Sequence, residues 1–200
     1  ASDTFDITVA NTNDAPTVAN VIADQAATED TAFRFQFAAD AFADVDVGDT
    51  LAYAATLADD PTLPEWLSFD PDTRTFSGTP LNADVGTITV RVAATDGTAS
   101  VFDDFDITVA NTNDTPTLAN VIADQAATED TAFSFQFAAD AFADLDAGDT
   151  LTYAASLANG DALPSWLSFD AATRTFSGTP LNADVGTISV RVTATDGTAS

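Results

Sequence analysis

The chain is a duplication. Residues 1–100 align with residues 101–200 without a gap, and 19 of the 100 aligned positions differ, which leaves 81 identical. A solenoid repeat is about 20–50 residues long, whereas a period of 100 equals the size of one small domain. The sequence therefore predicts two copies of one domain in tandem, each with its own core.

The expected domain boundaries do not coincide with residues 1, 100 and 200. Residues 4–14 recur as residues 104–114, near the end of the first full copy, and the second copy reaches residue 200 before this segment would come again. We therefore expect three parts: residues 1–14 as the last strand and linker of an upstream repeat, 15–114 as a complete repeat, and 115–200 as a second repeat that lacks its last strand.

A repeat without its last strand would present an unpaired sheet edge, which is a template for another chain. We expect residues 1–10 of a neighbouring molecule to complete the second repeat through Phe5, Ile7 and Val9, or the chain to be one unit of a continuous fibre.

Alternation of apolar and polar residues predicts strands at Phe33–Phe37, Ile88–Val92 and Phe105–Val109. Turn-forming Gly, Asp and Pro residues separate these strands from four weaker candidates, at residues 18–22, 51–57, 67–69 and 74–77. Seven short strands in about 100 residues are typical of a two-sheet Greek-key sandwich. The predicted fold class is all-β, with tandem seven-stranded Greek-key β-sandwiches.

Composition excludes several kinds of chemistry. The chain has 32 Asp and Glu against five Arg, no Lys, His, Cys or Met, and a formal net charge of −27. Nucleophile systems that need His or Cys cannot form, and zinc, copper, haem and iron–sulfur centres lose their usual ligands. The negative charge makes nucleic acid a poor partner, and no apolar stretch reaches the roughly 18 residues of a membrane span.

The acidic residues cluster in short segments of the sequence. The segment Asp44–Asp49 contains three Asp and recurs as Asp144–Asp149. In an extended chain Asp44 and Asp46 face the same side, and two carboxylates about 4 Å apart repel by roughly 4 kcal/mol at an effective dielectric constant of 20. A cation bound by oxygen ligands, Ca²⁺ above all, would relieve that repulsion. The alternative interpretation is that each Asp only forms a turn.

Six motifs together resemble tandem cadherin-like domains of the dystroglycan type, which occur in bacterial surface adhesins and secreted proteins. The motifs lie at residues 11–16 and 111–116 (NTNDAP and NTNDTP), 42–51, 63–70, 76–80 and 92–97. The resemblance covers the whole chain, and it implies sandwiches of the Ig/cadherin-like kind with calcium bound between consecutive domains.

The resemblance also implies a division of ligands across each linker. The complete junction would use Glu29, Asp84, Asn111, Asn113, Asp114, Asp144, Asp146 and Asp196, with Asn113 acting through its backbone carbonyl. The half-junction upstream would use Asn11, Asn13, Asp14, Asp44, Asp46 and Asp96.

This sequence departs from the cadherin pattern in its linkers, which begin with Asn11 and Asn111 where cadherins have Asp. Asn82 also replaces a bridging acid. The resemblance therefore implies one or two ions for each junction instead of three, and Asp30 and Asp49 are alternative ligands or turn caps.

These observations favour a calcium-rigidified segment of an extracellular adhesin or fibre at a bacterial cell surface, which mediates adhesion or projects a distal binding domain. Its expected partners are neighbouring repeats of the same or another copy, and cell-surface glycans. The alternative is a carbohydrate-binding module of a polysaccharide-associated secreted protein, in which Trp66 and Trp166 stack on sugars instead of packing in the core. Paired carboxylates can also cleave glycosides, but the duplication is unlike an enzyme, and we expect none.

Overall fold

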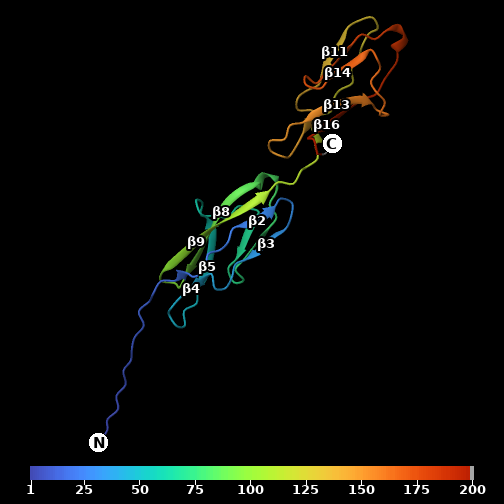
Figure 1. Ribbon diagram of the computed structural model, residues 1–200. Coiled ribbons are helices and arrows are strands. Elements are labelled where there is room, and N and C mark those ends of the chain that lie inside the picture. Colours follow the sequence, from blue (N-terminus) through green and yellow to red (C-terminus); the bar gives the residue numbers. More distant parts are fainter. Residues whose placement is uncertain (199–200) are drawn as a thin grey trace. The chain divides into compact units, whose positions relative to one another are not determined.

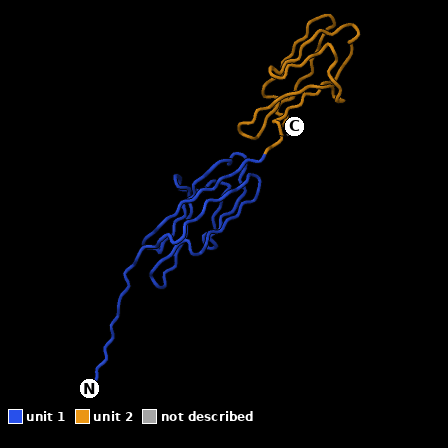
Figure 2. The backbone as a smooth tube through the Cα atoms, viewed as in Figure 1, with its two compact units in different colours: residues 1–112 blue, residues 113–200 orange. Residues whose placement is uncertain are grey.

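The computed structural model describes residues 1–198, which form two compact units (Figures 1 and 2). Unit 1 comprises residues 1–112, and unit 2 begins at Asn113. Each unit has its own core of buried side chains.

Unit 1 is built from nine strands and one turn of 3₁₀ helix. These are β1 (Thr17–Val18), β2 (Gln25–Thr28), β3 (Phe33–Gln36), β4 (Phe42–Ala43), β5 (Ala52–Leu57), β6 (Leu67–Asp70), β7 (Thr75–Gly78), η1 (Asn82–Asp84), β8 (Gly86–Thr95) and β9 (Ser100–Ala110). Residues 1–14 precede β1 and form no strand.

Two sheets face each other in unit 1. One has the order β2-β9-β8-β5 and the other β3-β7-β6, while β1 and β4 pair separately. This separation into a four-stranded and a three-stranded sheet matches the Greek-key sandwich of immunoglobulin domains. The predicted fold class is therefore confirmed, and the two sheets together hold seven strands.

One predicted strand differs from the structure. The sequence favoured a strand at residues 18–22, but β1 ends at Val18 and the next strand, β2, begins only at Gln25. Strand β2 runs parallel to β9, with Gln25 opposite Ile107. Its sequence, QAAT, has no alternation to detect, so its extended form depends on the partner strand.

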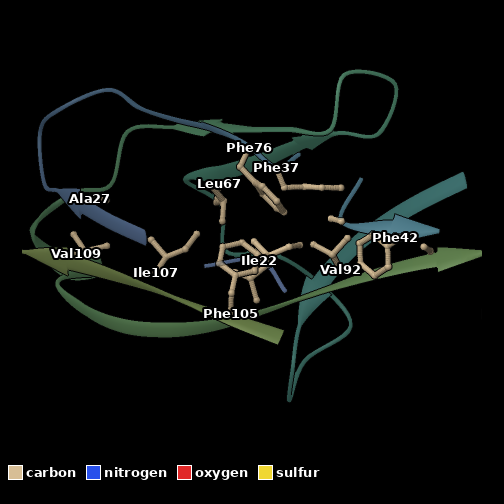
Figure 3. Close-up of a cluster of buried hydrophobic side chains, with 13 residues drawn as sticks. Ile22, Ala27, Phe37, Phe42, Leu67, Phe76, Val92, Phe105, Ile107 and Val109 are labelled. Carbon is tan, nitrogen blue, oxygen red and sulfur yellow. The ribbon is translucent and has the colours of Figure 1, made fainter. Parts of the chain in front are cut away.

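The core of unit 1 lies between the two sheets (Figure 3). Val90 and Val92 of β8 alternate inward, as do Phe105 and Ile107 of β9, and all four are buried. Phe76 of β7 has no exposed surface, and its ring lies 5.6 Å from that of Phe105 in an edge-to-face arrangement. Such ring pairs add to the stabilisation from burial.

Unit 2 repeats most of this arrangement. Its elements are β10 (Thr117–Leu118), β11 (Phe133–Gln136), β12 (Phe142–Ala143), β13 (Thr152–Leu157), β14 (Leu167–Asp170), β15 (Thr175–Gly178), η2 (Asn182–Asp184) and β16 (Val190–Thr195). The sheet order β11-β15-β14 reproduces β3-β7-β6, and β13 pairs with β16 as β5 pairs with β8. Within residues 113–198, no strand corresponds to β2 or β9.

A close backbone approach explains one glycine in each unit. A Cβ atom built on Gly78 would lie 1.7 Å from the carbonyl oxygen of Trp66, and one on Gly178 would lie 1.8 Å from that of Trp166. These contacts join β7 to the loop before β6, and β15 to the loop before β14. Only glycine fits there, because both close atoms belong to the backbone.

We expect Gly78→Ala to destabilise unit 1 by about 3 kcal/mol, since the added methyl forces β7 away from residue 66. Denaturant unfolding followed by Trp66 fluorescence in a Trp166→Phe background would measure this. Thr79→Ala, at an exposed neighbouring position, is the control and should change stability by less than about 0.5 kcal/mol. Equal stability of the two variants would contradict the packing argument.

Candidate metal centre

The acidic loop of unit 1 joins β4 to β5 and folds back on itself. The backbone N–H of Asp46 donates to Oδ1 of Asp44 at 2.9 Å, and that of Asp49 donates to the Asp46 carbonyl at 3.3 Å. Gly48, with φ of +106°, completes the turn in a conformation that other residues rarely adopt. One carboxylate oxygen from each of Asp44, Asp46 and Asp49 then lies within 4.8 Å of the others.

The residues that precede β1 are bound to this loop. The backbone N–H of Asp14 donates to Oδ2 of Asp46 at 2.7 Å, and Nδ2 of Asn13 donates to Oδ2 of Asp96 at 3.1 Å. Asp96 lies in the turn between β8 and β9, where its other oxygen accepts the N–H groups of Thr98 and Ala99. Three separate segments of unit 1 thus meet at one end of the sandwich.

Unit 2 contains the same arrangement one repeat later. The N–H of Asp114 donates to Oδ2 of Asp146 at 2.7 Å, and Nδ2 of Asn113 donates to Oδ2 of Asp196 at 3.0 Å. Carboxylate oxygens of Asp144, Asp149 and Asp196 lie within 4.8 Å of one another. We call the groups around Asp44 and Asp144 the acidic clusters; their members are Asn13, Asp14, Asp44, Asp46, Asp49 and Asp96, and the residues 100 positions later.

Each acidic cluster has an unsatisfied oxygen. Oδ2 of Asp44 and Oδ2 of Asp144 are buried and accept no hydrogen bond from the described residues. A buried acceptor without a partner is costly, and more so when it is charged. Each of these two oxygens is therefore able to accept a ligand from outside the chain.

The donor set fits Ca²⁺. Calcium takes six to eight oxygen ligands at about 2.3–2.6 Å, so two ligands of one ion are at most about 5 Å apart. The three carboxylate oxygens of each cluster satisfy this limit. With no nitrogen or sulfur ligand in the sequence, a hard cation is the chemical match.

The surroundings of two cluster acids shift their pKa values in opposite directions. Loss of solvation, and then the nearby charges of Asp146, Asp144 and Asp196, raise the pKa of Asp149. Asp96 behaves oppositely: the N–H groups of Ala99 and Thr98, with the Asn13 amide, lower its pKa. Loss of solvation and crowding by other acids thus favour the neutral form of Asp149, whereas hydrogen bonds favour the charged form of Asp96.

Glu29 and Asp84 lie at the opposite end of unit 1 from the acidic cluster. Glu29 is buried, with Oε1 accepting the N–H of Thr112 just beyond β9 and Oε2 lacking a partner. Asp84 caps η1 by accepting the N–H of Leu81 at 2.9 Å. Within unit 1, the predicted ligands thus separate into two groups, one at each end of the sandwich.

Other predicted ligands have simpler positions. Asn11 and Asn111 are exposed. Asp30 has a left-handed backbone, with φ of 55°, at the turn after β2. Asp149 was missing from the predicted set, although Asp49, its equivalent, was an alternative ligand; the duplication itself was the signal that could have placed both.

The tryptophans pack against the cores. Trp66 is half-buried on the core of unit 1, and its ring meets that of Phe33 edge-on at 6.1 Å between centroids. Trp166 meets Phe133 in the same way at 6.4 Å. This arrangement gives no support to the sugar-stacking alternative, which needs an open ring face.

A family model for the putative Ig domain matches residues 15–110 and again residues 115–200. The chain belongs to this family. The two matched ranges place an Ig domain in each unit, in agreement with the sheet order. No curated protein matches the sequence.

Solved structures with similar folds cover much of the chain. They include an endo-fucoidan hydrolase of glycoside hydrolase family 107 (25% identity, 92% of this chain, 27% of that chain, TM-score 0.41). Mouse clustered PcdhgC3 EC1-3 shares 19% identity over 92% of this chain and 64% of that one, with a TM-score of 0.49. The human Desmocollin-1 ectodomain shares 13% over 92% and 34%, with a TM-score of 0.42.

This chain spans about a quarter of the fucoidan hydrolase that it matches. With TM-scores below 0.5, none of these likenesses carries a conclusion about function.

We expect Asp149→Asn to raise the melting temperature of unit 2 at pH 7 in EDTA. Because the pKa of Asp149 is raised in the folded state, the folded protein binds more protons than the unfolded one above pH 3.8, and stability falls as the pH rises through that window. The substitution removes this loss, and its benefit should vanish at pH 3, where Asp149 is protonated in both states.

Trp166 fluorescence in a Trp66→Phe background would report the melting of unit 2. Asp140→Asn, at an exposed acid outside the cluster, removes the same charge and should produce a smaller gain at pH 7. A gain from Asp149→Asn that is the same at pH 3 and pH 7 would refute the explanation.

Proposed function

We propose that the chain is a calcium-stabilised segment of an extracellular adhesin or fibre, built from tandem Ig domains. One observation carries the proposal: both repeats gather acids from the same three segments and leave the same oxygen, Oδ2 of Asp44 or Asp144, buried without a partner. A turn-forming role alone does not require several carboxylates at one point.

The acidic clusters act on the linkers. Asp46 and Asp146 accept the backbone N–H of Asp14 and Asp114, and Asn13 and Asn113 bind the acids of the β8–β9 turn and its equivalent. A bound cation would neutralise the carboxylates that hold each linker to its domain. Without it, mutual repulsion weakens the same contacts, so the linker becomes freer to bend.

Calcium also suits the proposed location. Extracellular calcium-binding modules work with dissociation constants of about 10⁻⁴–10⁻³ M, and the chain offers such sites carboxylates and amides in abundance. No helix of the described residues is long and apolar enough to cross a membrane. Ligation by Glu29 and Asp84 from the preceding domain, and a bacterial origin, stay predictions from the cadherin resemblance.

Calcium titration of thermal unfolding tests the proposal. We expect Ca²⁺ to raise the melting temperature of the EDTA-treated chain, with a stabilisation of about 2.7 kcal/mol at 100 times the dissociation constant, and Mg²⁺ to do so less. Asp44→Asn combined with Asp144→Asn should weaken calcium binding at least tenfold, because it removes a charge from each cluster while Oδ1 remains an acceptor.

The matched control is Asp40→Asn combined with Asp140→Asn, which removes two exposed acids that belong to neither cluster. It should bind calcium as the parent chain does. A parent chain that ignores calcium, or equal affinities for the two double variants, would show that the acids only form solvated turns.

A second measurement concerns the linker. We expect small-angle X-ray scattering to detect more bending between the domains when calcium is removed, and the same bending with calcium present in a chain carrying Asp144→Ala and Asp146→Ala. Identical scattering profiles with and without calcium would separate binding from rigidification and contradict the mechanical part of the proposal.

A further inference from the structure

Tension along the chain would pass through unit 1 from one end to the other. The linker before β1 is bound at the end where β9 begins, because Nδ2 of Asn13 donates to Oδ2 of Asp96 in the turn that precedes β9. The chain leaves β9 at the opposite end, where the N–H of Thr112 donates to Glu29. Figure 1 shows these two ends of unit 1. The eleven residues of β9 separate them by about 35 Å, so a load between the two linkers acts along β9.

Such a load acts on β2 and β9 in opposite directions. The two strands are parallel, with Gln25 opposite Ile107 and Thr28 opposite Ala110. Strand β2 is pulled toward the end where β9 begins, and β9 is pulled toward the end where it finishes. Under this load the strands separate by sliding along each other, and the evenly spaced hydrogen bonds of a parallel pair resist together. Pulling the strands apart from one end would break the same bonds one after another.

Two acids fasten the pair near the end where the load enters β2. Oδ2 of Asp103 in β9 accepts the N–H of Ile22 at 2.6 Å, and Oδ1 of Asp24 accepts the N–H of Asp106 at 2.9 Å. Each segment thus offers a carboxylate to the backbone of the other. Hydrogen bonds with an ionised acceptor are roughly twice as strong as neutral ones, so these two contacts strengthen the pairing where sliding would begin.

A buried glutamate fastens the other end of the pair. The N–H of Glu29 donates to the carbonyl of Ala110 at 3.1 Å, and Oε1 of Glu29 accepts the N–H of Thr112. Only 1% of the Glu29 surface is exposed, so water has little access to these contacts. Carboxylate contacts to the backbone therefore close the pairing of residues 25–28 with residues 107–110 on both sides.

Core packing opposes the same sliding motion. Ile22 and Ala27 belong to the buried core that also contains Ile107 and Val109 of β9 (Figure 3). A shift of a strand by one residue exchanges the side chains that face the core with those that face solvent. Sliding of β2 would therefore bring Thr28, which is exposed, to the place of the buried Ala27. The loss of apolar burial adds to the loss of hydrogen bonds.

We propose that unit 1 bears mechanical load through a clamp formed by β2, β9 and the three acids Asp24, Asp103 and Glu29. The clamp lets the domain transmit tension between its linkers without unfolding, which is a function beyond cation binding. Its contacts lie within unit 1 and involve no member of the acidic cluster. The clamp therefore acts without calcium, and either it or the proposed function can fail alone.

Contacts nearer to the entry of the chain carry the load first. The N–H of Asp14 donates to Asp46, and β1 pairs with β4 over two residues. A cation in the acidic cluster would strengthen the contact of Asp14, whereas EDTA leaves it weak. Because the pairing of β1 with β4 is so short, we expect it to open at a lower force than the clamp. In EDTA the clamp is then the main barrier to unfolding under load.

Single-molecule pulling of the 200-residue chain in EDTA tests the clamp. The chain has no Cys, so Asn11→Cys with Asn111→Cys attaches handles at exposed positions on either side of unit 1. Thr31→Cys with Asn111→Cys is the control geometry. Thr31 follows β2 as Asn111 follows β9, so the load between them peels the two strands apart. Forced unfolding is governed by the unfolding rate, and we expect roughly twice the unfolding force in the first geometry at the same loading rate.

The acids are tested in both geometries. Asp24→Ala combined with Asp103→Ala should remove about half of the difference between the two forces, because two charge-assisted contacts are lost. It should leave the peeling force unchanged, because peeling begins at the other end of the strands. Asp24→Asn combined with Asp103→Asn keeps an acceptor oxygen at each site and should retain most of the force. Asp40→Ala combined with Asp59→Ala, at two exposed acids outside the clamp, is the matched control and should change neither force.

Equal unfolding forces in the two geometries would overturn the inference. An equal loss in both geometries from Asp24→Ala with Asp103→Ala would show that the two acids only stabilise the fold, and would overturn their place in the clamp. A difference between the geometries that appears only with calcium would assign the load to the acidic cluster instead. None of these results decides whether the chain binds calcium, which the titration of the melting temperature measures separately.

Discussion

The pairing of β9 with β8 and β2 is the interaction on which the rest of the sandwich depends. Strand β9 inserts Phe105, Ile107 and Val109 between the sheets and pairs along all ten residues of β8. It also gives Gln25–Thr28 the partner that makes these residues a strand. In unit 2, where the described residues contain no equivalent of β9, residues 125–128 form no strand and Val190 is partly exposed.

The two units are alike in one sheet and differ in the other. The sheet β11-β15-β14 and the rings of Phe137, Phe169 and Phe176 keep the arrangement of unit 1. The units differ mainly at residues 120–128 and 186–190, whose equivalents in unit 1 include β2 and the first part of β8. The hydrogen bonds of the facing sheet lie within that sheet, so its order is the same in both units.

The acidic clusters set a different constraint, because their carboxylates lie close enough to repel one another in the absence of a counter-charge. Each cluster uses Asp in two ways at once: in unit 1 the side chain of Asp44 and the backbone N–H of Asp46 form the turn, and carboxylate oxygens of both residues lie close together. The same residues also hold the linker through Asp14. Charge, turn geometry and linker position are therefore coupled at one end of each domain.

Much of the fold could be predicted because alternation reflects burial on one face of a strand. It located β3, β8 and β9, whose inward residues are buried or half-buried. It failed for β2, since Ala26 and Ala27 carry no contrast and a parallel partner strand 82 residues away decides their conformation. The core position of Trp66 stayed open for a similar reason: an apolar run does not tell which ring face a neighbouring sheet will cover.

The sequence by itself determined the duplication, the all-β class, the absence of His and Cys chemistry and the places where Asp accumulates. These are properties of composition and spacing, which need no partner. Only the tertiary structure decided that Asp44, Asp46 and Asp49 converge, that Asp96 joins them through Asn13, and that Glu29 lies at the other end of the same domain. The physical reason is that hydrogen bonds between segments up to 83 residues apart set these distances, and local sequence holds no record of which segments will meet.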